Sequence, residues 1–414
     1  MVDIWLPYGR TEVHATIASD NLMGIIELHD EPGIKDVTSE IEKAAKELIS
    51  SEKIMRMERK KDKIALSLNI FDIPLAKLIL SSVMKEIAYA GLRDENLVVI
   101  ITNNPFMMGV FDTIKHLKEE IASLLGINVV VHDPTHDNIH VCDLEDGAKV
   151  YLDKAFVEAD VRVAISTVEP SPYTLYSCCE IGVAFGLTSL ETIKDILLPI
   201  LDADDFQERV FEKSIKVSEI AKLDLSMGIV KNPRNEVARY FVGDPEKVLR
   251  KSLDAVNSIY RVILREQPDI VIISPGGSPF DADIFSAYMY LENALKVVRR
   301  NGVVILVAEC SEGYRRPEHY QLIRKVNGDL SLLEETLKSE FTIEGFIAYR
   351  FLRTFKKASI IMASSIPDYY ASKIPGLKIF RSVNDALNDA LNRFRTKVKV
   401  TVAPYGIFIP IIEK

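Results

Sequence analysis

Short, continuous apolar runs alternate with longer amphipathic segments along most of this chain. Runs such as VVIIT and VRVAIST are apolar at nearly every position, which is typical of parallel strands covered on both faces. Between them, apolar residues recur at helical spacing, as at Ile41, Ala45 and Leu48. In the first half, the pattern predicts short N-terminal strands, strands at 64–69, 97–102, 128–132 and 161–167, and helices at 38–49, 74–90 and 111–125.

The second half repeats this pattern after a stretch, 186–265, that is predicted to be mostly helical. Strands alternating with helices indicate parallel sheets. We therefore predict an α/β protein with two doubly wound, mostly parallel-sheet domains, 1–267 and 268–414, and a cleft between them. The predicted elements of the second domain are strands at 270–274, 303–309, 359–364 and 378–380, helices at 283–300, 330–337 and 343–355, and a strand-like tail.

The composition is that of a globular protein and narrows the range of partners. The 414 residues are 48% hydrophobic and 27% charged, with a net charge of -9. An acidic chain without a basic face argues against nucleic-acid binding. No apolar run reaches the ~18 residues that a membrane span needs, and the N-terminus lacks a signal-peptide pattern. Four cysteines do not make a disulfide framework, so we expect a cytoplasmic protein.

Two strand ends in the second half carry residues suited to a small polar ligand. The strand at 270–273 ends in Ser274-Pro275-Gly276-Gly277, and the next strand ends in a loop that holds Glu309, Glu312 and Arg315. Ligands bind at such strand ends in open α/β sheets. Backbone N–H groups of the glycines could receive an anion, and an arginine could bind it directly. The alternatives are a tight turn and surface ion pairs.

Two further clusters suggest chemistry but favour a structural interpretation. His132, His136 and His140 have the spacing of a helical metal site, but Pro134 lies between them and favours a loop after a strand. The adjacent thiols in Cys178-Cys179 are poorly placed to chelate one ion, and we favour packing under a helix.

Five motifs follow one another in order along the chain. They are LPYG at 6–9, the His132-Asp133 stretch that leads to the strand at 161–167, GLTSLETI at 186–193, SPGGSPFD at 274–281 and AECSEG at 308–313. Together they resemble the nickel-pincer-nucleotide lactate racemase family. The resemblance implies that family's fold and the racemisation of a 2-hydroxy acid. It also implies a lysine bonded to the cofactor, a histidine on nickel, two base histidines and cations for the carboxylate.

The positions where the family carries these groups hold other residues here. Phe71 stands at the family's arginine, and Asn104 and Ser171 stand at or near its two bases. Ile181 and Leu197 are near the positions of the cofactor lysine and the nickel histidine. The family's Tyr-Gln-x-x-Lys segment is FSAYM, residues 285–289. We therefore expect no nickel-pincer cofactor, no metal and none of the family's catalytic residues.

Two functions remain open at this point. The first is a divergent family member that binds a small anionic molecule or acts as a partner subunit in a homo- or hetero-oligomer. The second is an active 2-hydroxy-acid racemase, epimerase or other isomerase with a different residue set. The missing groups favour the first, and the Gly-rich loops favour a retained binding site. That site is predicted to contain Asn104, Glu169, Tyr173, Ser274, Gly276, Gly277, Asp281, Glu312 and Arg315.

Overall fold

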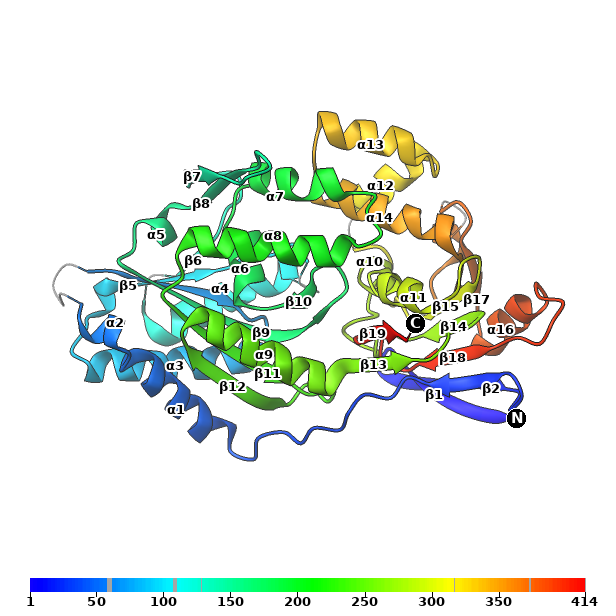
Figure 1. Cartoon of the computed structure of the whole chain (residues 1–414), viewed down its shortest axis with the longest axis horizontal. Helices are drawn as coiled ribbons and strands as arrows, with labels where there is room; N and C mark the ends of the chain where they lie inside the picture. The colour runs from blue at the N-terminus through cyan, green and yellow to red at the C-terminus, as the bar shows by residue number, and fades with distance from the viewer. Residues whose placement is uncertain (58–61, 107–109, 128, 316, 372–373, 414) are drawn as a thin grey trace. The chain divides into compact units, whose positions relative to one another are not determined.

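The computed structural model describes residues 1–57, 62–106, 110–127, 129–315, 317–371 and 374–413. Its contacts divide the chain into two compact units. Figure 1 shows the ribbon of the chain with its helices and strands labelled. The N-terminal unit is His29–Ile200 with Asp205–Ile259, and the C-terminal unit is Met1–Leu28, Leu201–Asp204 and Tyr260–Lys414. This division differs from a single boundary near residue 267, because the first 28 residues fold with the C-terminal unit.

The N-terminal unit is built on a mostly parallel sheet. Across the sheet, the strands are β12 (Val237–Gly243), β11 (Leu225–Lys231), β9 (Val161–Ser171), β4 (Ile64–Asn69), β5 (Leu97–Ile101) and β6 (Val129–Val131). Only β12 and the short β10 (Leu175–Ser177), which pairs with the end of β9, run antiparallel to their neighbours. Every residue of β4 is buried, as expected for a strand covered on both faces.

Helices cover both faces of this sheet. On one face lie α1 (Val37–Ile49), α3 (Ile73–Tyr89) and α4 (Val110–Leu125). On the other lie α6 (Cys179–Gly186) and α9 (Pro245–Tyr260), with α8 (Phe206–Ala221) against α6. Leu66 and Leu68 of β4 enter the first core. Asn69 faces α6. A Cβ built on Gly182 of this helix would lie only 2.8 Å from the Asn69 Cβ. Because glycine has no Cβ, the helix can pack closely on the strand.

The C-terminal unit has a fully parallel sheet. Its strands are β17 (Lys378–Phe380), β16 (Ser359–Ala363), β15 (Val303–Val307), β14 (Ile270–Ile273), β18 (Val400–Ala403) and β3 (Leu22–Ile25) in that order. One face packs on α11 (Leu291–Val297) and α14 (Ile343–Lys357), with α10 (Ile284–Tyr288), α12 (Pro317–Val326) and α13 (Leu330–Ser339) against α14. The other face packs on α16 (Val383–Leu391) and on the hairpin of β1 (Val2–Tyr8) and β2 (Thr11–Ile17).

The N-terminal hairpin explains why the first residues belong to this unit. Ile4 and Leu6 of β1 and Ala15 and Ile17 of β2 are buried in the same core as the apolar residues of β14, β15 and β18. β3 then extends the sheet as an edge strand parallel to β18. The predicted fold class, an α/β protein with two units on mostly parallel sheets, is confirmed.

Several elements differ from their predicted form. The stretch 186–265 contains β11 and β12 besides helices. Ser226 and Gly228 interrupt the apolar pattern of β11, and pairing with β9 makes it a strand. Helix α1 begins one residue earlier than predicted, at Val37, and is capped by Asp36, whose Oδ1 accepts the Ser39 N–H at 3.0 Å.

The remaining elements are short. They are α2 (Glu52–Met55), η1 (Asp94–Asn96), the hairpin of β7 (Asn138–Asp143) and β8 (Lys149–Asp153), α5 (Lys154–Val157), α7 (Leu190–Leu197), η2 (Leu198–Ile200), β13 (Arg261–Leu264), α15 (Asp368–Ala371) and β19 (Ile409–Ile412). Among the described helices, none combines the length and apolar character that crossing a bilayer requires.

Candidate functional site

The carboxyl ends of β14, β15 and β18 form the edge where the C-terminal sheet would hold a ligand. The chain leaves β14 toward β15 on one side and returns to β18 on the other. Such a reversal of strand order is the usual ligand position in an open α/β sheet. The predicted residues Ser274, Gly276 and Gly277 lie at this edge.

In the structure, the turn of the N-terminal hairpin occupies this position. Ser274 Oγ donates to the Pro7 carbonyl at 2.6 Å, and the Ser278 N–H donates to the Gly9 carbonyl at 2.8 Å. Gly277 has a φ of +76°, and a Cβ there would lie 2.8 Å from the Gly9 carbonyl oxygen. The Gly276 N–H donates to Ser274 Oγ at 3.1 Å. The Gly-Gly segment therefore forms a tight turn, the alternative named for it, and it packs against a hairpin that the sequence did not indicate.

Asp281 joins three segments at the same edge. Its side chain is fully buried, and Oδ2 accepts the N–H groups of Gly9 at 2.7 Å and Glu309 at 3.0 Å. Oδ1 has no hydrogen-bond partner among the described residues. The predicted ligand residue Asp281 thus holds the hairpin turn and the β15 loop together.

The loop after β15 combines a buried thiol with an exposed ion pair. Cys310 is buried with a φ of +53°, and burial raises the pKa of its thiol. Arg315 Nε lies 2.8 Å from Glu312 Oε2, and both side chains are more than one third exposed. The pair is therefore a surface ion pair, which was the alternative to a ligand site. The Arg315 guanidinium nevertheless remains accessible to solvent. Arg316 lies outside the described residues.

A buried tyrosine–histidine cluster follows this loop and has no counterpart in the sequence-based predictions. The fully buried ring of His319 contacts the hydroxyls of Tyr288 and Tyr314, the latter at 2.9 Å from Nδ1. Burial raises the pKa of Tyr314. Phe285 packs edge-on against His319 at 5.1 Å. The signal available in the sequence was the density of aromatic residues between 285 and 320, which carries no chemistry by itself.

In the N-terminal unit, Asn104 and Ser171 are the residues that the motif resemblance sets at or near two base histidines. Asn104 is 1% exposed; its Oδ1 accepts the Phe106 N–H at 3.1 Å, while its Nδ2 has no partner among the described residues. Ser171 Oγ accepts the Thr174 N–H at 3.3 Å and the Thr174 hydroxyl at 2.7 Å. Each of these side chains therefore stabilises its own loop.

The two other predicted site residues of the N-terminal unit, Glu169 and Tyr173, differ in burial. Tyr173 is 1% exposed and packs on Phe106 with ring centroids 5.8 Å apart. Glu169 is half-buried, and desolvation raises the pKa of its carboxyl, against the attraction of Lys231. Among the predicted site residues of the N-terminal unit, Glu169 is thus the one that carries a titratable carboxyl.

Lys231, which sequence reasoning missed, is a buried lysine at the end of β11 that contacts the half-buried Asp72 and the exposed Asn235. Its Nζ is 2.6 Å from Asp72 Oδ2 and 3.0 Å from Asn235 Oδ1. Asp72 also caps α3, because its Oδ1 accepts the Leu75 N–H at 3.1 Å. The signal in the sequence was a lysine at the end of an apolar strand, but that strand was not predicted.

The start of α6, which the motif resemblance sets near a cofactor lysine, is entirely buried. The thiols of Cys178 and Cys179 and the carboxyl of Glu180 all have raised pKa values, chiefly because burial disfavours their charged forms. Glu180 Oε2 has no hydrogen-bond partner among the described residues. Both thiols are therefore packing groups, as the favoured interpretation expected.

The three histidines do not converge on a metal site. His132 is buried, with Nδ1 3.0 Å from Asp153 Oδ2 and Nε2 3.0 Å from the Thr188 carbonyl. His136 and His140 are exposed and pair locally with Asp133 and Asp143. Within the described ranges, no three His, Cys, Asp or Glu side chains are grouped so that they could hold a metal ion.

Comparison with known proteins relates the chain to lactate racemases over nearly its whole length. Residues 8–197 match the lactate racemase N-terminal domain, and residues 263–411 match the lactate racemase C-terminal domain. Lactate racemase of Thermoanaerobacterium thermosaccharolyticum is 22% identical over 431 residues, which cover 100% of both chains. That of Lactiplantibacillus plantarum is 21% identical over 423 residues, covering 98% of this chain and 99% of that protein.

Solved structures show the same fold. The lactate racemase apoprotein of Thermoanaerobacterium thermosaccharolyticum superposes with a TM-score of 0.83 at 20% identity, covering 99% of this chain and 100% of that one. A protein from Thermotoga maritima superposes with a TM-score of 0.61 at 15% identity, covering 93% of this chain and 100% of that one.

Proposed function

Because the chain belongs to the lactate racemase family, we propose that it binds a small carboxylate without using the nickel-pincer group. The proposal separates two properties of the family. The fold and the carboxyl-end loops are retained, and the groups that would hold the cofactor and move protons are replaced.

The proposal rests on the burial and the chemistry of the residues at the positions where we expected the cofactor ligands and the bases. Ile181 and Leu197, near the cofactor lysine and the nickel histidine, are fully buried apolar side chains of α6 and α7. Neither offers a nitrogen to a pyridinium group or to nickel. The amide of Asn104 and the hydroxyl of Ser171 are not useful bases near neutral pH, and the Asn104 Oδ1 and the Ser171 hydroxyl accept hydrogen bonds from their own loops. The residues present therefore do not fit the family's cofactor.

The ligand class follows from the family and from one accessible cation. The curated relatives are lactate racemases, so a hydroxy acid of about the size of lactate is the first candidate. Arg315 is 38% exposed, beyond the end of β15. A guanidinium can bind a carboxylate through two parallel hydrogen bonds. Glu312 is one partner of Arg315 that a ligand would displace, and a surface ion pair contributes little to stability.

Nickel content and intact mass test the first half of the proposal. The full-length protein is co-expressed with the enzymes that make the pincer cofactor, purified, and examined by elemental analysis and native mass spectrometry. The expected result is no stoichiometric nickel and no nucleotide-sized mass increment. Racemisation of lactate above a heat-treated control, or nickel at one atom per chain, would overturn it.

A thermal-shift screen of lactate and related hydroxy acids tests the second half. A ligand at about 100 times its dissociation constant stabilises the native state by roughly 2.7 kcal/mol. The variant Arg315→Gln should lower the affinity by about 1–3 kcal/mol if the guanidinium bonds the carboxylate. Arg395→Gln, at another exposed arginine of the same unit, is the matched control and should bind like the wild type. If no acid shifts the wild type, the partner-subunit function gains support.

A further inference from the structure

A pocket of about 610 Å³ opens on the N-terminal unit, on the face that carries α1 and α3. Three segments form it: the strap at 33–37 that leads into α1, the first turns of α3, and the start of β12. The strap is held in place by the Ile34 N–H, which donates to the Val237 carbonyl at 2.7 Å. Gly33 allows it to approach, because a Cβ there would lie 2.8 Å from Glu236 Cβ.

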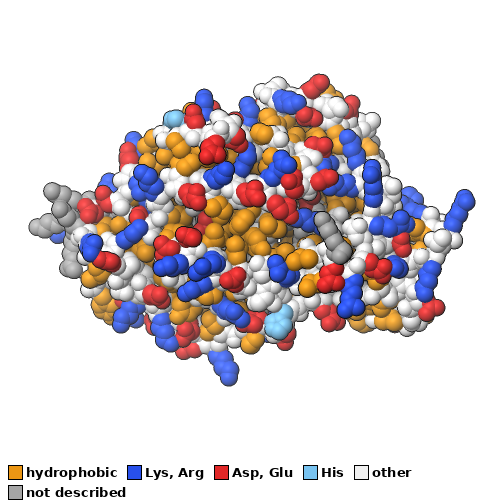
Figure 2. Space-filling model, viewed as in Figure 1, with side chains coloured by type: hydrophobic (Ala, Val, Ile, Leu, Met, Phe, Trp, Pro, Cys, Tyr) orange, Lys and Arg blue, Asp and Glu red, His pale blue; other side chains and the backbone are white. Residues whose placement is uncertain are grey.

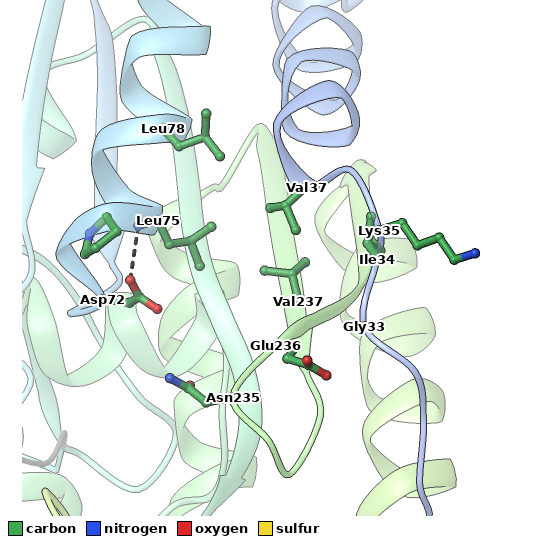
Figure 3. Close-up of a pocket in the computed structure, with 11 residues that line it drawn as sticks. Gly33, Ile34, Lys35, Val37, Asp72, Leu75, Leu78, Asn235, Glu236 and Val237 are labelled. Atoms are coloured by element: carbon green, nitrogen blue, oxygen red, sulfur yellow. Dashed lines mark hydrogen bonds between the residues drawn. The ribbon is translucent and has the colours of Figure 1, made fainter.

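The walls of the pocket are apolar. Figure 3 shows Val37, Leu75, Leu78 and Val237 directed into one hollow from three elements. Val37 and Leu78 are only partly buried at the margin of the core. The apolar surface that they leave open is the kind that a small-molecule pocket uses for most of its contact area.

One end of the hollow is polar and rich in hydrogen-bond acceptors. Asp72 and Asn235 lie there, whereas Lys35 extends away from the hollow (Figure 3). Asp72 accepts from the Leu75 N–H and from Lys231 Nζ, and Asn235 Oδ1 accepts from the same Nζ. A carboxylate has about four acceptor positions, so Asp72 can accept further hydrogen bonds from a ligand.

We propose that this pocket binds a small amphipathic molecule whose polar head donates hydrogen bonds, an amine or an alcohol on a short apolar body. The apolar body lies against Val37, Leu75, Leu78 and Val237, and the head donates to Asp72. A carboxylate head would meet an acceptor that already carries negative charge, so the pocket should bind it more weakly than an amine or an alcohol. This selectivity is opposite to that of the small-carboxylate site proposed above and does not depend on it.

Methyl-labelled protein provides a direct readout, because four pocket residues carry Leu or Val methyl groups. The full-length protein is titrated separately with hexylamine, hexanol and hexanoate, and methyl shifts are followed by NMR. The methyls of Val37, Leu75, Leu78 and Val237 are expected to move with hexylamine and hexanol. Both should bind more tightly than hexanoate by about tenfold, the ratio that one hydrogen bond to a charged group supports. Equal or tighter binding of hexanoate, or no shift at these methyls, overturns the proposal.

Two variants locate the binding. Leu78→Trp fills the hollow and should abolish the shifts, while Leu124→Trp, at a leucine 49% exposed on α4, should leave them unchanged. Asp72→Asn keeps a side chain that can cap α3 but removes the charge. It should remove the preference for hexylamine over hexanoate, with the remaining methyl shifts as evidence that the pocket is folded. Unchanged binding in Leu78→Trp, or an unchanged amine preference in Asp72→Asn, contradicts the site.

Discussion

Glu180 is a carboxylic acid held inside the N-terminal unit with one oxygen that lacks a partner among the described residues. Burial raises its pKa above the unfolded value. Between the unfolded and the folded pKa, the unfolded chain has lost the proton that the native protein keeps. The free energy of unfolding is therefore highest below the unfolded pKa and falls as the pH rises toward the folded pKa.

The substitution Glu180→Gln should remove this part of the pH dependence. Over the interval between the two pKa values, wild type loses up to about 1.4 kcal/mol per pH unit from this group, and the variant should not. Urea unfolding from pH 4 to pH 8 measures the difference. Glu191→Gln, at a glutamate 52% exposed on α7, is the control. Parallel pH profiles for wild type and Glu180→Gln would show that Glu180 is not the group responsible.

The cysteines differ in accessibility in a way that predicts their reactivity. Cys178, Cys179 and Cys310 are buried and their thiol pKa values are raised by burial, whereas Cys142 is half-buried. Because the thiolate is the reactive form, a thiol reagent at pH 7.5 should label one cysteine in the native protein and four in denaturant. Cys142→Ser should abolish the native reaction. Rapid native labelling of Cys178 or Cys179 would contradict the packed state of α6.

At the scale of elements, the Gly276-Gly277 turn joins β14 to the N-terminal hairpin. Gly277 and Gly147 both have a positive φ, +76° and +84°, but only Gly277 is crowded, by the Gly9 carbonyl. Gly277→Ala adds a clash to the strain of a left-handed alanine, which costs about 1–3 kcal/mol by itself. Gly147→Ala adds the strain alone.

Thermal or chemical unfolding of the two variants measures how much free energy of unfolding each one loses. Gly277→Ala is expected to be the more destabilised, and hydrogen exchange should become faster in β1 and β2. Equal losses in the two variants would mean that the hairpin turn moves away at no cost. In that case the turn is not a fixed part of the carboxyl edge.

At the scale of the whole molecule, the short segment Leu201–Asp204 folds with the C-terminal unit although its neighbours on both sides belong to the other unit. Arg350 of α14 holds it, with Nη1 donating to the Leu201 and Ala203 carbonyls at 3.1 and 3.2 Å. Nε of the same arginine is 2.9 Å from the buried Glu292. Arg353 adds a bond of 2.6 Å to Asp202.

Arg350→Met should release this segment and leave Glu292 as a buried charge. Removing one partner of a buried ion pair costs about 3–5 kcal/mol. The loss is measured by urea unfolding, and faster amide exchange is expected at 201–204. Arg393→Met, which breaks a partly exposed pair with Asp389, should cost about 0–1 kcal/mol. If exchange at 201–204 stays slow in Arg350→Met, other contacts anchor the segment.

The sequence alone determined the properties that depend on neighbouring residues. Apolar runs and helical spacing are local patterns, so β4, β5, β14 and β16 and helices such as α3 were predicted within one or two residues. The order of the motifs identified the family, and the comparisons confirm it. Strand β11 was not predicted, because small residues interrupt its apolar pattern and only its pairing with β9 makes it a strand.

The tertiary structure decided which side chains meet. Gly9 and Asp281 are 272 positions apart and are joined by a hydrogen bond of 2.7 Å. No pattern along the chain could indicate that the Gly-Gly turn receives the hairpin, or that Lys231 lies against Asp72. Such contacts follow from the way distant segments pack. For that reason, local patterns specify the architecture of this protein, and only the folded chain shows how its loops and buried charges are used.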